Sequence, residues 1–200
     1  QDELTPEKLR RAASLAASAA QKRKLGTVTF FLPEIFPGTD AAMTPSLTAR
    51  SLAEGAILGT YRFRKYFTED TKKHPALSRI RVTSEHDAHA APIRTALRNA
   101  AIVCEGVKLA RDRENAPPND LYPETLAEAA RASGAKHGYR VTVWDEKRIR
   151  QAGFGGLLAV SAGSVRPPRF LIMELNAGVA GLETIVLVGK GVTFDAGGIS

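Results

Sequence analysis

The segment TIVLVGKGVTFDAGGIS, residues 184–200, decides the fold class, because a short apolar run passes directly into a charged, glycine-rich loop. The run from Thr184 to Val188 predicts a buried β-strand. Lys190 and Asp195 follow among glycines, which let the backbone turn sharply and approach a ligand closely. Charged side chains at the end of a buried strand are costly unless they are paired or bind a metal. The segment therefore predicts a ligand site at the carboxyl end of a strand, as in open α/β sheets.

Three chemical interpretations of Lys190 and Asp195 are open. A phosphate-binding loop needs a glycine five residues before its Gly-Lys pair and a Ser or Thr directly after it. Thr184 and Gly191 occupy those positions, so the sequence fails both requirements. An ordinary ion pair at the end of a strand is the second interpretation. The third is a metal site, because a carboxylate is a hard oxygen ligand and a lysine amine binds a metal once burial beside a cation has deprotonated it.

The segment Val188–Ser200 resembles the metal-binding segment of the leucyl aminopeptidase family, the cytosolic two-metal peptidases. Two upstream blocks extend the resemblance in family-like order and spacing over residues 99–200. They are Asn115–Asn119 with the following Pro123, and Leu157–Val160 with Gly163, Ser164 and Pro167–Phe170. The first 98 residues match more loosely, mainly through Glu54–Tyr61.

The resemblance implies a role for two residues of this chain. Lys190 is expected to bind one metal ion of a pair, and Asp195 to bridge both ions. The family's catalytic lysine, its arginine and its other carboxylate ligands are expected beyond Ser200, so no catalytic residue is expected here. Because each such ion needs at least about four ligands, the chain alone is expected to be inactive, as an incomplete part of a larger enzyme.

The resemblance also implies an activity and a setting. The complete enzyme is expected to release N-terminal amino acids, of leucine type, from peptides by means of metal-activated water. Two divalent ions, Zn²⁺ or Mn²⁺, a homo-hexameric assembly and a cytoplasmic location are expected from the family alone.

Alternating helix and strand patterns predict an α/β fold with a largely parallel sheet. The resemblance divides it into a partial, macro-like N-terminal lobe (1–87), a linking helix (88–114) and the start of the catalytic domain (115–200). The expected helices begin at Thr5, at a cap formed by Thr48, and at residues 88, 123 and 145, and the expected strands lie at 27–32, 78–83 and 139–143. Three apolar runs follow at 157–161, 170–175 and 185–188.

Composition limits the remaining possibilities. No apolar stretch approaches the roughly 18–20 residues of a membrane span, and no signal peptide is visible. The single Cys104 excludes an internal disulfide, and its place on an apolar helix face predicts a core residue. His86 and His89 are spaced three apart, but they lack a carboxylate partner pattern, which disfavours a metal site there.

The net charge of +7 and the pI of about 9.8 keep a DNA-binding regulatory role as an alternative function. Basic clusters such as Arg62–Lys65 and Arg111–Arg113 also have a simpler interpretation as solvated faces. A second alternative, an ADP-ribose-binding module, follows from the macro-like resemblance. It is disfavoured because residues 1–87 contain no glycine-rich phosphate loop.

Overall fold

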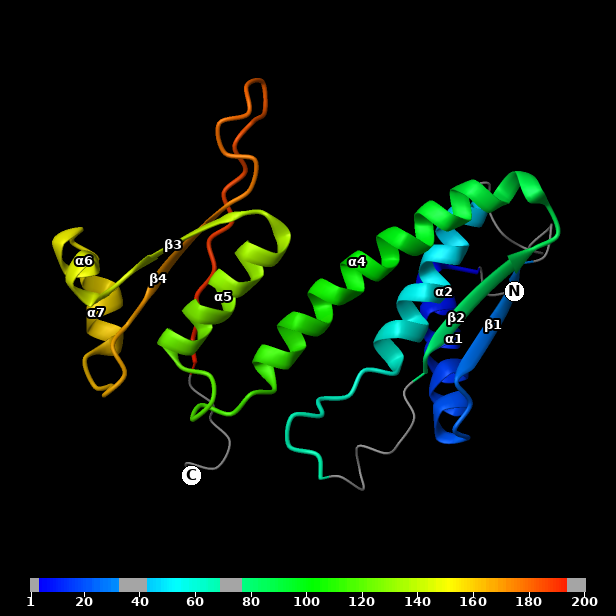
Figure 1. Cartoon of the computed structure of the whole chain (residues 1–200), viewed down its shortest axis with the longest axis horizontal. Coiled ribbons are helices and arrows are strands. Elements are labelled where there is room, and N and C mark those ends of the chain that lie inside the picture. Colours follow the sequence, from blue (N-terminus) through cyan, green and yellow to red (C-terminus); the bar gives the residue numbers. More distant parts are fainter. Residues whose placement is uncertain (1–3, 33–42, 69–76, 194–200) are drawn as a thin grey trace. The chain divides into compact units, whose positions relative to one another are not determined.

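The computed structural model describes residues 4–32, 43–68 and 77–193, which form two compact units. The first unit ends at Asn115 and the second begins at Ala116. Helices and strands occur in both units (Figure 1), so the mixed α/β class predicted from the sequence is confirmed. The three-part domain division stays a prediction.

The first unit begins with helix α1, Pro6–Lys22, whose start follows from its first residues. The Thr5 side chain accepts a hydrogen bond from the Lys8 backbone N–H at 3.2 Å. Pro6 occupies the first turn, where a missing N–H costs nothing. The helix stops where Lys24 takes a left-handed backbone conformation, with φ of 59°.

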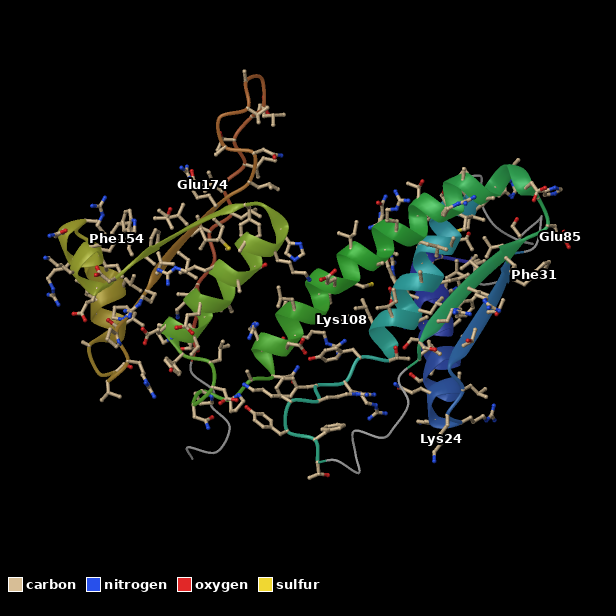
Figure 2. The ribbon with its side chains drawn as sticks, in the orientation of Figure 1. Lys24, Phe31, Glu85, Lys108, Phe154 and Glu174 are labelled. Carbon is tan, nitrogen blue, oxygen red and sulfur yellow. The ribbon has the colours of Figure 1, made fainter. Side chains whose placement is uncertain are left out.

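A parallel strand pair with an intervening helix forms the centre of this unit. Strands β1 (Thr27–Leu32) and β2 (Arg79–Ser84) pair over their full length, and helix α2 (Pro45–Gly59) connects them. Burial alternates along both strands, so the helices cover one face of the pair and leave the other exposed. Phe31, which is 58% exposed, lies on that open face (Figure 2).

Helix α2 begins one turn earlier than the sequence analysis predicted. Thr44, not Thr48, is the cap, and its side chain accepts a hydrogen bond from the Leu47 N–H at 3.2 Å. The reason is visible in the sequence, because Thr44 and Pro45 repeat the Thr-Pro start of α1. Thr48 is instead completely buried, and its hydroxyl has no hydrogen-bond partner among the described residues.

Small residues bring α1 and α2 into close contact. The core of the unit consists of Leu9, Ala13, Ala17, Leu32, Ala49, Leu52, Ala56 and Ile93. Half of these are alanines, which let the helix backbones approach each other. At the crossing, a Cβ added to Gly55 would collide with the backbone carbonyl of Arg10. Ser18 donates a hydrogen bond to the Gly59 carbonyl at 3.0 Å across the same contact.

A buried carboxylate joins the two helices beside this crossing. Glu54 is 6% exposed, and it accepts hydrogen bonds from Arg10 Nε at 2.8 Å and from Arg50 Nε at 2.7 Å. Burial by itself raises the pKa of Glu54, but the hydrogen bonds from Arg50 and Arg10 outweigh it and leave that pKa below its ordinary value. The carboxylate therefore stays ionised and ties α1 to α2.

Helix α4, Ala90–Glu114, follows a short 3₁₀ turn, η1, at Asp87–His89, and packs on α2. Cys104 is completely buried on this helix, as predicted, and burial raises the pKa of its thiol. Near the end of α4, Asp112 accepts a hydrogen bond from the Tyr61 hydroxyl at 2.8 Å. This bond fixes the segment after α2 to the helix. None of the described helices is both long and apolar enough to span a membrane.

The second unit starts with helix α5, Pro123–His137, and strand β3, Arg140–Trp144. The Tyr122 N–H donates a hydrogen bond to Thr125 Oγ1 at 3.0 Å and so closes the first turn. Gly138, with φ of 77°, ends the helix, a conformation that glycine adopts without strain.

An antiparallel strand pair completes the second unit. Helices α6 (Glu146–Gln151) and α7 (Gly155–Ser161) lead into strand β4 (Phe170–Glu174), which pairs antiparallel with β3. This corrects the expectation of a parallel sheet for the described part of this unit, because the chain that returns through α6 and α7 enters β4 in the direction opposite to β3. It also places the apolar run 157–161 in a helix.

Aromatic rings hold the end of this strand pair together. The ring centroids of Trp144, Phe154 and Phe170 lie 5.0–5.8 Å from one another. Such ring pairs contribute about 0.5–1.5 kcal/mol beyond the area that they bury. At the opposite end, Arg140 makes two hydrogen bonds to Glu174, at 2.8 and 2.9 Å.

The Glu54 contact predicts a specific loss of stability. We expect Glu54→Gln to lower the free energy of unfolding by about 2 kcal/mol, because hydrogen bonds to a charged group are worth roughly 1.5–3 kcal/mol each and the new amide leaves one arginine unsatisfied. Urea denaturation measures this change. Glu146→Gln is the matched control, since its ion pair with Arg150 is exposed on both sides and should contribute little.

The pH dependence distinguishes this contact from simple packing. The pKa of Glu54 is lower in the folded protein than in the unfolded chain, where it is about 4.3. The ionised carboxylate therefore stabilises the fold fully at pH values above the unfolded pKa. This stabilisation is lost as the pH falls through the folded pKa. The stability difference between the wild type and Glu54→Gln should therefore narrow as the pH is lowered below about 4. A difference that does not change with pH would contradict the role of the ionised carboxylate.

The helix crossing predicts opposite effects for two glycine substitutions. Gly55→Ala should destabilise the protein by about 1–3 kcal/mol, because the added methyl group meets the Arg10 backbone. Gly106→Ala in α4 meets no atom within 4 Å and should be stabilising, by up to about 1 kcal/mol, through helix propensity. Thermal unfolding compares the two. Equal effects would show that α1 and α2 do not pack at Gly55.

Candidate metal site

Lys190 lies in a segment without regular structure. Residues 175–193 form neither helix nor strand, and among the described residues no backbone hydrogen bond starts from an N–H in 183–193. Lys190 itself is exposed. Asp195, the second predicted ligand, lies outside the described residues, so the predicted convergence of the two side chains stays a prediction.

The buried strand predicted at 184–188 is wrong for this structure. Ile185, Val186, Leu187 and Val188 are 84%, 74%, 92% and 94% exposed. The physical reason is pairing: an apolar run becomes a buried strand only when neighbouring strands and helices cover it, and none of the described strands pairs with this one. An apolar sequence favours a buried strand, but it does not specify which strands or helices cover it.

The segment nevertheless passes close to a regular element. A Cβ added to Gly191 would lie 3.7 Å from Leu126 Cδ2, an ordinary van der Waals distance. Helix α5, which carries Leu126, therefore flanks the backbone next to Lys190.

The described residues do not assemble a metal centre of their own. They contain no group of three His, Cys, Asp or Glu side chains close enough to hold an ion. His86 and His89 do meet, with ring centroids 5.5 Å apart, but His89 Nδ1 lies 3.3 Å from the Ser84 hydroxyl. The expectation that these histidines bind no metal stays a prediction.

Comparison with known proteins decides the family. Residues 108–200 match the sequence model described as the cytosol aminopeptidase family, catalytic domain. Residues 1–70 match the model for the N-terminal domain of the same family. The chain belongs to the cytosol aminopeptidase family. The resemblance seen in the sequence at 188–200 is thereby confirmed, and the two family domains follow each other in the expected order.

Curated relatives of this family match almost the whole chain. A probable cytosol aminopeptidase of Roseiflexus castenholzii is 37% identical over 97% of the chain, and one of Micrococcus luteus is 42% identical over 99%. The chain spans 39% and 37% of the length of these relatives. It thus corresponds to about two-fifths of a family member.

Solved structures give the same result for the fold. The bottromycin maturation enzyme BotP, in complex with Mn, is 29% identical, covers 84% of the chain and superposes with a TM-score of 0.68. A mutant of tomato leucine aminopeptidase, at 22% identity, covers 86% with a TM-score of 0.70 and supports the fold alone. The chain covers 33% of each of these structures. The names of the relatives described here give the DNA-binding alternative no support.

The unpaired apolar run predicts rapid hydrogen exchange. In this chain, backbone amides of residues 184–193 should exchange within seconds, because they donate no hydrogen bond to the described residues. Mass spectrometry of peptic peptides measures this exchange. Strand β4, which is equally apolar but paired with β3, is the internal control and should be protected. Equal protection of both segments would show that 184–188 is already a paired strand.

Proposed function

We propose that the chain is part of a two-metal aminopeptidase that removes N-terminal amino acids, of leucine type, from peptides. The observation that carries this proposal is the match of residues 108–200 to the catalytic domain of the cytosol aminopeptidase family. Because the chain spans about two-fifths of its curated relatives, the activity belongs to the complete enzyme. The 200-residue chain alone is proposed to be inactive.

The donor set of the chain fits divalent ions in kind but not in number. A neutral lysine amine and a carboxylate both suit Zn²⁺ or Mn²⁺. Two such ions need at least about four ligands each, and the described residues add no cluster of further donors. Lys190 and Asp195 are therefore proposed as the contribution of this chain to a site that further residues complete.

The two residues are proposed to differ in what they contribute. Lys190 supplies an amine lone pair to one ion, which requires that the side chain loses its proton and its present exposure to water. Asp195 would hold both ions through its carboxylate. When bound, the metals supply Lewis acidity that activates water and stabilises negative charge on the scissile carbonyl oxygen.

Burial of the apolar run is proposed to accompany site formation. Ile185 to Val188 expose nearly all of their surface here, and covering them removes that surface from water, which is favourable at about 25 cal/mol per Å². Covering this run would also bring Lys190 to the end of a buried strand, where ligand sites of open α/β sheets lie.

The proposed setting follows from the family. Its members are called cytosol aminopeptidases, and we propose a cytoplasmic location and a homo-hexamer for the complete enzyme. The Mn of the BotP complex supports manganese as one candidate metal.

Replacement of the proposed ligands in the complete enzyme tests the assignment. Asp195→Asn should lose bound metal and reduce kcat/KM by at least about 100-fold, since even residues that only orient a ligand cost 10–100-fold. Lys190→Ala should weaken one of the two sites, so that at a low free metal concentration it binds about half as much metal as the wild type. Elemental analysis measures the bound metal of each variant, and peptide hydrolysis measures its kcat/KM.

Matched controls keep the test specific. Asp145→Asn removes an exposed carboxylate that caps α6, and Lys147→Ala removes an exposed lysine of the same helix. Both controls should retain metal and activity. Normal metal content in Asp195→Asn would remove that residue from the site.

A further inference from the structure

A cavity in the first unit is lined mainly by positive charge. Its volume is about 510 Å³, which lies within the roughly 300–1,000 Å³ typical of small-molecule sites. Four cationic side chains line it: Arg62, Arg64, Arg79 and Lys108. Asp112 is the one carboxylate among the described lining residues.

The cationic side chains come from three separate parts of the unit. Arg62 and Arg64 follow the end of α2, and Arg79 is the first residue of β2. Lys108, which Figure 2 labels, lies on α4. The segment carrying the first two is fixed by Tyr61, whose hydroxyl donates to Asp112 at 2.8 Å. The fold, and not a local run of sequence, therefore brings the charges to one concave place.

Three of the four cationic lining residues, Arg62, Arg79 and Lys108, have no ion pair within the described part of the chain. Asp112 already accepts the Tyr61 hydroxyl, and burial together with this hydrogen bond raises the pKa of Tyr61, so the phenol stays a donor. A concave surface lined by one sign of charge focuses its field and concentrates counter-ions.

We propose that this cavity is a binding site for a small anion that carries several phosphate groups. Arginine guanidinium groups match phosphate oxygens in pairs, and lysine adds a point charge. Ile57, Leu77 and Ile80 also line the cavity, so it has apolar lining as well as charge. The cavity lies in the first unit, apart from the proposed metal ligands in the second.

The phosphate of a nucleic acid shares this chemistry, but the shape of the site favours a small ligand. Duplex DNA presents a convex rod with one charge per roughly 1.7 Å of axis, which suits a long basic stripe. The cavity is concave, and its volume of about 510 Å³ matches a small ligand better than a duplex.

Calorimetric titration of the complete polypeptide with inorganic tripolyphosphate tests the proposal. Saturable binding is expected, and Arg79→Gln and Lys108→Gln should each weaken it on the order of tenfold, the effect of one charge-assisted contact. Arg81→Gln and Arg98→Gln are matched controls, because they are exposed arginines of the same strand β2 and the same helix α4 that do not line the cavity. They should bind as the wild type does.

The outcomes separate the possible sources of binding. No saturable heat with tripolyphosphate overturns the proposal. Equal weakening by the cavity variants and by the control variants also overturns it, because binding then follows overall charge. If a 20-base-pair duplex binds and tripolyphosphate does not compete with it, the basic surface binds nucleic acid instead, and the proposal is overturned. Retained peptidase activity in the cavity variants is expected and keeps this test independent of the proposed function.

Discussion

The contact between α1 and α2 is the constraint on which the first unit depends. Alanines and Gly55 allow the two backbones to approach, and the close approach buries the Glu54 carboxylate beside Arg10 and Arg50. An isolated charge could not remain there, because burial disfavours ionisation. The small side chains permit the close helix contact, and the paired arginines allow the carboxylate to be buried within it. The parallel strands and α4 pack on the helix pair that results.

Most regular elements could be predicted from local sequence. Thr5 with Pro6, and Gly138, mark helix ends by rules that need no tertiary partner, and periodicity locates the long helix α4. The cap of α2 was misplaced because Thr44 follows a stretch rich in proline and glycine, which obscured the signal. In α1 the buried alanines are Ala13, Ala17 and Ala20, and this set depends on where α2 crosses, which cannot be derived from α1 alone.

The site predicted around Lys190 could be inferred from the sequence only in part. The motif around Lys190 identifies the family, because glycines, an amine and a carboxylate occur at a fixed spacing. It does not say whether Ile185 to Val188 are covered, since that depends on residues far away in sequence. The cationic cavity was missed for the same reason: Arg62 lies in a predicted solvated cluster, and its neighbours Arg79 and Lys108 come from a strand and a helix that only the fold joins.

The single thiol of the chain offers a built-in reporter. Cys104 has no exposed surface, and a raised pKa keeps it in the unreactive protonated form. A thiol reagent therefore reaches the sulfur only when α4 separates from the rest of the first unit. The rate of labelling measures how often that separation occurs, without any engineered probe and without interference from a second cysteine.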